Sequence, residues 1–200
     1  CQIHWDYVNI PPEWLHPTAI SWPFEAWGMD IIGPISPSSS KGHRFIFAAT
    51  DYFSKWSEAF AFSEMKTSSV LQFLRTNIIC RFGIPKRFVH DNGPQFRDHR
   101  FYRFCDKYKI QSCPSTPYIP TANGLAKAFN KTLCKILKKM VSSHKRDWSD
   151  KLPEALWAYR TTVRGPTHST PFSLVYGCEA VVPLEVQIPV SYTHLRAHET

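Results

Sequence analysis

Residues 117 to 140 read P-Y-I-P-T-A-N-G-L-A-K-A-F-N-K-T-L-C-K-I-L-K-K-M, a proline-rich loop that runs into a long amphipathic helix. At about 100° per residue, six apolar side chains fall on one stripe of this helix and five lysines fall on the opposite side. One face is therefore expected to pack into a core, and the other to present a row of ammonium groups. The apolar stripe comprises Leu125, Phe129, Leu133, Ile136, Leu137 and Met140, and the lysines are Lys127, Lys131, Lys135, Lys138 and Lys139.

The composition indicates a globular domain with a basic surface. With 43% hydrophobic residues, including 14 Phe, 7 Trp and 8 Tyr, a chain of 200 residues can fill one core. The 24 Lys and Arg residues exceed the 16 Asp and Glu residues, and the resulting net charge of +8 favours a polyanionic partner. A solvated helix face is the alternative explanation for the lysine row.

The cysteines and the apolar runs bear on the compartment. The six cysteines form no C-x-x-C pair and sit within apolar or helical patterns, as reduced core thiols do. No apolar run approaches the roughly 18 residues of a membrane span, and no signal stretch opens the chain. We therefore expect an intracellular protein, in the nucleus or the cytoplasm, that is neither secreted nor associated with a membrane. Because the first residue is Cys rather than Met, we expect a fragment of a longer protein.

The periodicity predicts an α/β fold with a mixed five-stranded sheet flanked by helices. Three apolar runs joined by turns predict an antiparallel meander at the start, and strands then alternate with helices. Gly83 and Pro85 are expected to end the first helix. The predicted strands are 27–35, 44–51, 55–62, 86–90 and 110–114, the predicted helices are 67–82, 98–109, 124–140 and 148–163, and 170–177 caps the fold.

Two carboxylates terminate or interrupt apolar strands of this predicted sheet. Alone, Asp30 is explained as a strand-end cap, and Asp91, which precedes Asn92-Gly93-Pro94, as part of a turn. Together they could converge on the sheet surface as oxygen ligands for Mg²⁺. Hard divalent cations suit phosphoryl transfer, in which one ion activates the attacking oxygen and a second stabilises the leaving oxygen.

Four ordered motifs resemble the catalytic core of integrases from Gypsy-type long-terminal-repeat retrotransposons. They are W-G-M-D-I-I-G-P (27–34), F-V-H-D-N-G-P-Q-F (88–96), Y-I-P-T-A-N-G-L-A-K-A-F-N-K-T-L (118–133) and T-P-F-S-L-V-Y-G (170–177), and the resemblance covers residues 20 to 189. It implies a ribonuclease H-like fold, an Asp-Asp-Glu triad that binds two Mg²⁺ or Mn²⁺ ions, and insertion of element DNA into a chromosome. It also implies assembly as a homo-oligomer on DNA.

On this resemblance Asp30 and Asp91 are the first two catalytic residues and metal ligands, and the third acid follows after thirty-five intervening residues. Residues 92 to 126 make thirty-five, so Lys127 stands where the family has Glu. An ammonium group has three donors and no acceptor, so it cannot ligate a cation, and the triad charge changes from −3 to −1. We expect Lys127 to pair with Asp30 or Asp91 in place of the metal, and strand transfer to be lost.

The resemblance also implies DNA contacts and shows further departures. Asn92 and Gln95 lie in the loop beside the site, Asn123 lies at the start of the helix, and Lys131, Lys135, Lys138 and Lys139 are expected on the DNA side. Ile119, Thr121 and Leu125 differ from the residues usual in the family. A change of Glu to Lys needs one base substitution, so decay of a genomic copy, repurposing and a sequencing error are alternatives.

The resemblance divides the chain into a core with flanking pieces. Residues 1–20 are expected to be a remnant after a truncated zinc-binding module, 21–180 the integrase core, 181–189 the start of a connecting segment and 190–200 a non-native tail. Only Cys1 of the zinc ligands is present, and one thiol cannot make a tetrahedral site, so no zinc is expected. His4 and His16 are expected to be surface residues, and His194 with His198 is not expected to bind metal.

Three functions remain open from the sequence. The first is an integrase-type polynucleotidyl transferase, active or ancestrally so, which depends on the triad. The second is a non-catalytic nucleic-acid-binding module that uses the lysine row. The third is a translated relic without a selected role.

Overall fold

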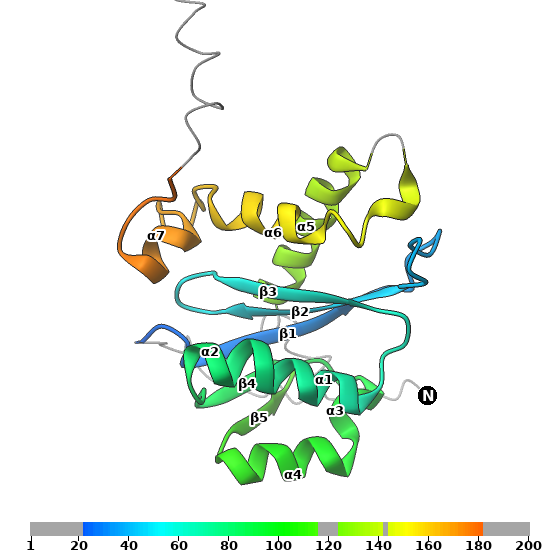
Figure 1. Cartoon of the computed structure of the whole chain (residues 1–200). Helices are drawn as coiled ribbons and strands as arrows, with labels where there is room; N and C mark the ends of the chain where they lie inside the picture. The colour runs from blue at the N-terminus through cyan, green and yellow to red at the C-terminus, as the bar shows by residue number, and fades with distance from the viewer. Residues whose placement is uncertain (1–21, 116–123, 142–143, 182–200) are drawn as a thin grey trace, which may run out of the picture.

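Five strands form one mixed sheet in the order β3-β2-β1-β4-β5 (Figure 1). The structure is a computed structural model that describes residues 22–115, 124–141 and 144–181. The predicted loop before residue 124, the remnant at 1–20 and the tail at 190–200 lie outside these residues, as do most of 181–189 and the site residue Asn123. The strands are β1 (Ala26–Ile32), β2 (Phe45–Asp51), β3 (Ser57–Phe62), β4 (Arg87–His90) and β5 (Gln111–Pro114).

The first three strands form the predicted antiparallel meander, whereas β4 pairs with β1 in parallel. β1 ends at Ile32, earlier than predicted, because the chain turns at Gly33 with φ +140°. A Cβ atom at Gly33 would lie 2.6 Å from the Phe45 ring and 2.7 Å from the Arg44 carbonyl oxygen, so this turn requires glycine.

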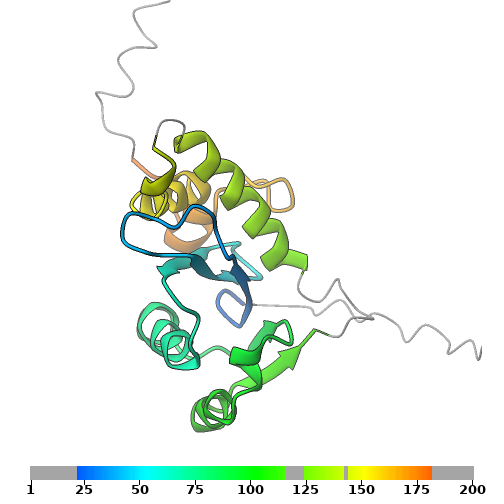
Figure 2. The same ribbon diagram turned by 90° about the vertical axis from the view of Figure 1, so that its right-hand side faces the viewer.

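Helices cover both faces of the sheet (Figures 1 and 2). One face carries a continuous helical stretch and two further helices, and the other carries α5, α6 and α7. β2 is buried on both sides because Phe47 belongs to the core cluster under the first layer and Ile46 to the cluster under the second. The helices are α1 (Thr67–Phe73), η1 (Leu74–Ile79), α2 (Cys80–Phe82), α3 (Pro94–Arg97), α4 (His99–Tyr108), α5 (Gly124–Met140), η3 (Lys145–Asp147), α6 (Leu152–Arg160) and α7 (Pro171–Tyr176).

The helix predicted for residues 67–82 has the predicted ends but not a uniform geometry. α1 and α2 flank the π-helical segment η1, and Gly83 ends the stretch with φ +88°. Within η1 the Thr76 hydroxyl donates to the Gln72 carbonyl oxygen at 2.9 Å. Helical periodicity in the sequence does not distinguish a π segment from an α-helix.

The helix predicted from Trp148 begins later and ends earlier, at Leu152 and Arg160. Trp148 belongs instead to the core cluster beneath α5 and α6, and its indole nitrogen donates to the Pro37 carbonyl oxygen at 3.4 Å. Pro153 then occupies the first turn of α6, where its missing N–H costs nothing.

The buried face of α5 is rotated from the predicted stripe. Ala126, Phe129, Asn130, Leu133 and Leu137 are buried, whereas Leu125, Ile136 and Met140 are only half-buried. All five lysines of the helix are exposed, as predicted. No helix among the residues described here is long and apolar enough to cross a membrane.

Candidate functional site

Asp30 and Asp91 lie at the same level of two neighbouring parallel strands. Ala26, Trp27 and Gly28 of β1 pair with Arg87, Phe88 and Val89 of β4, so each pair differs by 61 positions. Asp30 and Asp91 also differ by 61 positions, and adjacent strands lie about 4.8 Å apart. The negative charge of Asp91 accordingly raises the pKa of Asp30. The two carboxylates therefore converge, as predicted.

Asp30 faces α5, because alternate side chains of a strand share one face and those of Trp27 and Met29 belong to the core on the other side. One carboxylate oxygen, Oδ1, accepts a hydrogen bond from the Ile31 N–H at 3.0 Å. The other, Oδ2, accepts from the Asn130 side-chain amide at 2.9 Å. Burial is the main cause that raises the Asp30 pKa, and these two donors oppose it.

Asn130 is the site residue that the sequence reasoning missed. An ionised carboxylate only accepts hydrogen bonds, so the amide nitrogen of Asn130 must face Asp30. Its amide oxygen is buried and has no hydrogen-bond partner among the described residues. Asn130 lies three residues after Lys127, and residues three apart are neighbours on a helix surface. This spacing was the signal in the sequence that Asn130 could lie near the site.

Asp91 forms the turn that its local sequence predicts. The Gly93 N–H donates to Asp91 Oδ1 at 3.1 Å, which holds one carboxylate oxygen against the loop. A Cβ atom at Gly93 would lie 3.0 Å from both Asp91 Oδ1 and Gln95 Oε1, so a larger residue would displace the carboxylate or the glutamine. The loop thus keeps Asp91 at the end of β4.

His90 supports this loop from below and was also missed. Its Nδ1–H donates to the Asp91 carbonyl oxygen at 2.6 Å, so the neutral ring accepts from the Ser112 hydroxyl at Nε2, at 2.8 Å. The ring stacks on Phe96 with centroids 4.5 Å apart and is 1% exposed. Burial lowers the pKa of His90 below its ordinary value, so the neutral form is favoured.

Lys127 is close enough to act on Asp30 electrostatically but does not form the expected ion pair. Its positive charge lowers the pKa of Asp30. However, no ion pair within 4.0 Å joins Lys127 to Asp30 or Asp91 in the part of the chain described. The expectation was wrong because the rotation of α5 turns Asn130, not Lys127, toward the carboxylate, and Lys127 stays exposed.

The lysines of α5 spread around the helix from this point. At about 100° per residue, Lys138 and Lys131 lie about 20° and 40° from Lys127, whereas Lys135 and Lys139 lie about 80° and 120° away. At a rise of about 1.5 Å per residue, Lys127 and Lys138 are separated by about 16 Å along the axis. Lys127, Lys131 and Lys138 therefore form one row that starts near Asp30 and runs along the helix, which we call the site row.

The predicted DNA contacts in the loop have different surroundings. Asn92 is exposed, directly after Asp91. Gln95 is half-buried, and its side-chain amide donates to the Met65 carbonyl oxygen at 3.4 Å. The Gln95 side chain therefore helps to hold the loop in the fold. Contact of Asn92 or Gln95 with DNA stays a prediction.

The donor set does not fit the three-acid metal site that the resemblance implies. Two carboxylates and an ammonium group meet here, and one carboxylate already accepts hydrogen bonds at both oxygens. Among the described residues no group of three or more His, Cys, Asp or Glu side chains could hold a metal ion. Mg²⁺ needs oxygen ligands, which Lys127 cannot provide.

Comparisons with known proteins identify the family of this chain. The sequence profile of the family described as "Integrase core domain" (rve) matches residues 21–120, half of the chain. The Gag-Pol polyprotein of avian reticuloendotheliosis virus is 30% identical over 162 residues, which cover 80% of this chain and 14% of the polyprotein. The Transposon Tf2-3 polyprotein of Schizosaccharomyces pombe is 29% identical over the whole chain, which covers 15% of it. The chain thus spans about a seventh of these relatives.

Solved structures share the fold. An intasome of simian T-cell lymphotropic virus, in complex with PP2A regulatory subunit B56 gamma, contains a chain that matches with a TM-score of 0.68 and 24% identity, over 80% of this chain and 57% of that one. The HTLV-2 integrase catalytic core domain, in complex with magnesium and in a trimeric form, matches with a TM-score of 0.61 and 21% identity, over 76% of this chain and 95% of that one. The fold is therefore the ribonuclease H-like fold of retroviral integrase cores, as predicted.

Proposed function

Because this chain belongs to the integrase core domain family, we propose that it is the core of a Gypsy-type long-terminal-repeat retrotransposon integrase that binds DNA but has lost polynucleotidyl transfer. The similar polyproteins come from a retrovirus and from a fission-yeast transposon, which supports an origin in such an element. We propose that the protein acts on DNA inside the cell, either in the nucleus or, after its assembly, in the cytoplasm.

The observation that carries the proposed defect is the position of Lys127 beside Asp30 and Asp91. The Lys127 charge acts on Asp30, and Asn130 of the same helix is hydrogen-bonded to that carboxylate. A carboxylate at this position of α5 would lie within electrostatic range of Asp30 and could add an oxygen ligand for a cation. The ammonium group instead removes an acceptor and adds a positive charge that repels any approaching cation. We propose that this exchange abolishes productive Mg²⁺ or Mn²⁺ binding.

DNA binding does not need the metal. The site row of Lys127, Lys131 and Lys138 is exposed, and Lys135 and Lys139 continue the positive surface around α5. None of these five side chains forms an ion pair within the described residues. Unpaired ammonium groups in a row can each neutralise a phosphate of a DNA backbone and release its counterions.

Two assays test the two halves of the proposal separately. A duplex oligonucleotide with a labelled 3′ end is incubated with the purified chain and Mg²⁺ or Mn²⁺, and no joined product is expected. Fluorescence anisotropy with a labelled duplex is expected to show binding that weakens with salt. If each of the five lysines of α5 neutralises one phosphate, the slope of log affinity against log salt is about −4.5, or a loss of about 500-fold between 50 and 200 mM.

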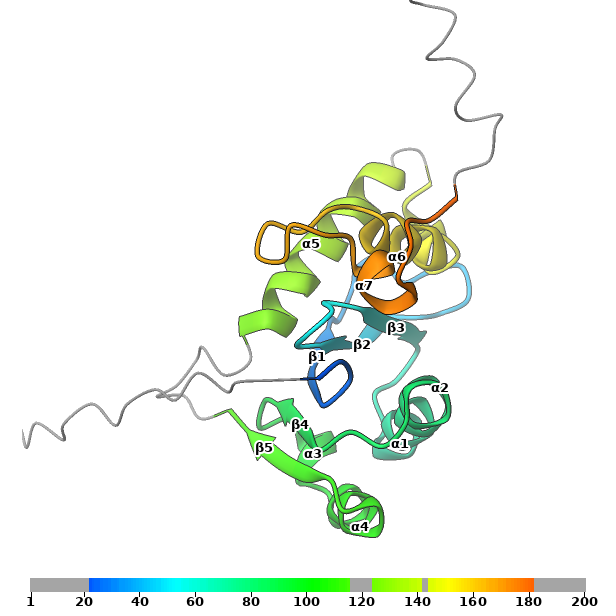
Figure 3. The same ribbon diagram turned by 90° about the vertical axis from the view of Figure 1, so that its left-hand side faces the viewer.

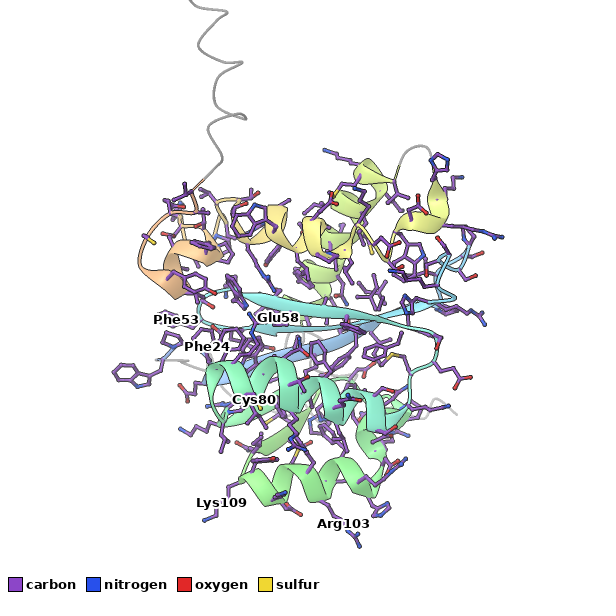
Figure 4. The ribbon with its side chains drawn as sticks, viewed as in Figure 1. Phe24, Phe53, Glu58, Cys80, Arg103 and Lys109 are labelled. Carbon is purple, nitrogen blue, oxygen red and sulfur yellow. The ribbon has the colours of Figure 1, made fainter. Side chains whose placement is uncertain are left out.

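Matched double variants locate the DNA surface. Replacing Lys131 and Lys138 with Gln removes two contacts, so the salt slope is expected to become less steep by about 1.8. Arg103 of α4 and Lys109, which follows α4, lie on the other face of the sheet (Figure 4). Replacing both with Gln makes the same change of charge and is expected to leave the slope unchanged. Joined product from the unmodified chain contradicts the proposed defect, and equal slopes in both variants contradict the proposed surface.

The family relatives also favour self-association. The HTLV-2 core has been solved in a trimeric and a dimeric form. We propose that this chain forms homo-oligomers as well, and sedimentation equilibrium of the purified chain tests this by its mass.

A further inference from the structure

A groove with no role in the proposed DNA surface separates the helical stretch α1 to α2 from α4. It has a volume of about 610 Å³. The helices that line it lie on the face of the sheet opposite α5 (Figure 3). Cys80 of α2 lines the groove, whereas Arg103 of α4 and Lys109, the residue after it, project toward solvent (Figure 4). A duplex lying along α5 cannot reach this groove, because the sheet and its core stand between them.

The floor of the groove is apolar. Leu71, Phe104 and Tyr108 line it, and each is a partly buried side chain at the edge of the core cluster below. The rings of Phe104 and Tyr108 are in contact, with centroids 4.9 Å apart. An aliphatic or aromatic side chain of a partner would therefore find apolar atoms on both walls, and burying it removes apolar surface from water.

Both charged residues that line the groove are cations, one on each wall. Arg75 belongs to η1 and Lys107 to α4, and both are exposed. Neither forms an ion pair with any described residue, although other cations nearby in the chain do: Arg81 of α2 lies 2.7 Å from Glu58, and Arg100 of α4 lies 2.6 Å from Asp98. In the part of the chain that the structure describes, no acidic side chain lines the groove. The groove is thus complementary to an apolar group flanked by negative charges.

The π-helical geometry of η1 contributes one of these walls. A π segment is rarer than an α-helix and is common at functional sites. Here η1 supplies Arg75 and Thr76 to the groove, and the Thr76 hydroxyl donates to the Gln72 carbonyl oxygen at 2.9 Å. Gln72 also lines the groove, so the irregular segment and the groove coincide.

We propose that this groove docks an acidic peptide segment of a protein partner, with an apolar side chain on Phe104 and Leu71 and carboxylates on Arg75 and Lys107. The charges favour a peptide over a nucleic acid strand. A strand needs several cations in succession along its backbone, whereas this groove offers two, on opposite walls. In a peptide with an apolar residue between acidic ones, the apolar side chain can contact the floor of the groove and the carboxylates can contact Arg75 and Lys107.

Fluorescence anisotropy of the whole chain tests the proposal with three labelled probes. The first is a peptide with a repeated Glu-Leu-Glu-Phe pattern, the second has Gln in place of every Glu, and the third is a single-stranded oligothymidine of the same charge. The acidic peptide is expected to bind with a dissociation constant below about 1 mM and to slow the reaction of Cys80 with a thiol reagent. In the double variant Arg75→Glu with Lys107→Glu, its affinity is expected to fall about tenfold.

Controls separate this surface from the DNA surface and from loss of folding. The double variant Lys135→Glu with Lys139→Glu carries the same charge change on α5 and is expected to bind the acidic peptide as the unmodified chain does. The milder variant Arg75→Gln with Lys107→Gln is expected to weaken peptide binding with an unchanged melting temperature, because both side chains are exposed.

Three results would each overturn the proposal. The first is no binding of the acidic peptide up to about 1 mM. The second is equal binding of the acidic and the Gln-substituted peptides. The third is loss of oligothymidine binding in the Arg75 and Lys107 variants with peptide binding intact, which would identify a nucleic acid surface instead. Failure of the proposed DNA binding on α5 has no bearing on these results.

Discussion

Substituting Lys127→Glu tests the central claim about the site. The change replaces an ammonium group by a carboxylate beside Asp30 and Asp91, so the local charge becomes −3 instead of −1. Without a metal ion the three carboxylates repel one another, and the variant is expected to be less stable than the unmodified chain. With Mg²⁺ the three carboxylates offer a complete set of oxygen ligands, so its stability is expected to depend on the ion.

The size of both effects follows from the position of residue 127. Unit charges about 4 Å apart interact by about 4 kcal/mol at an effective dielectric of 20. Because Lys127 is exposed, water screens this interaction, and we expect a loss of about 1 kcal/mol in the absence of metal. At a Mg²⁺ concentration of 100 times the dissociation constant, binding stabilises by about 2.7 kcal/mol. For a chain of this size that raises the melting temperature by about 5 to 11 °C.

Thermal unfolding followed by circular dichroism measures this directly. The unmodified chain, Lys127→Glu and Lys127→Gln are melted in EDTA and in increasing MgCl₂, and only Lys127→Glu is expected to show the rise. Lys127→Gln removes the cation without adding a ligand. Lys135→Glu makes the same charge change as Lys127→Glu, at a position about 80° around the helix from residue 127. This variant controls for a general effect of charge on α5.

Two outcomes would refute the reasoning. If the unmodified chain showed the same Mg²⁺-dependent rise, Lys127 would not exclude the ion. If Lys127→Glu folded but showed no rise, residue 127 would not occupy the position of the third ligand. A rise in Lys135→Glu as large as in Lys127→Glu would show that the effect is not specific to the site.

Three further predictions concern the surroundings of the site. Because the pKa of His90 is lowered in the folded state, the unfolded state binds more protons below about pH 6.5, and the free energy of unfolding should fall on acidification by up to about 1.4 kcal/mol per pH unit. Urea titrations at several pH values should show a smaller dependence of this free energy on pH for His90→Gln. An unchanged pH dependence would contradict the buried neutral ring. Asn130→Asp replaces the amide that donates to Asp30 by a carboxylate that can only accept, so the free energy of unfolding should fall by about 1–3 kcal/mol at pH 7. The loss should be smaller at about pH 4, where a protonated carboxyl group can donate again. A loss independent of pH would count against the contact. Leu133→Ala should cost about 2–5 kcal/mol in urea unfolding, because Leu133 is 0% exposed on the buried face of α5. A cost below about 1 kcal/mol would contradict the packing of that face.

Much of the fold followed from local patterns. Apolar alternation located all five strands, and Gly83 ended the first helical stretch as predicted. Two features did not follow. The π geometry of η1 depends on which carbonyl each N–H reaches, which composition does not specify. The late start of α6 depends on Trp148, whose position is decided by contact with a loop 111 residues away.

The site was predictable in part for the same reason. Asp30 and Asp91 end or follow apolar strands, so their convergence follows once the strands pair in parallel. The ion pair expected of Lys127 was wrong, because the rotation of α5 about its axis decides which side chain meets Asp30. A helix with apolar residues on a broad face can be buried at several rotations, and only packing against the sheet selects one.

The sequence alone determined the integrase core family and the row of lysines along one helix, and it predicted that Lys127 stands where the family has its third acid. Each of these depends on residue identity, on order along the chain or on spacing within a few turns, and all are visible without coordinates. Only the tertiary structure decided that Asn130 holds Asp30, that burial favours the neutral form of His90 beneath the Asp91 loop, and that Arg75 and Lys107, which form no ion pair with the described residues, line opposite walls of an apolar groove. These contacts join segments distant in the chain, and their free energies depend on burial and distance, which arise only when helices and sheet pack together.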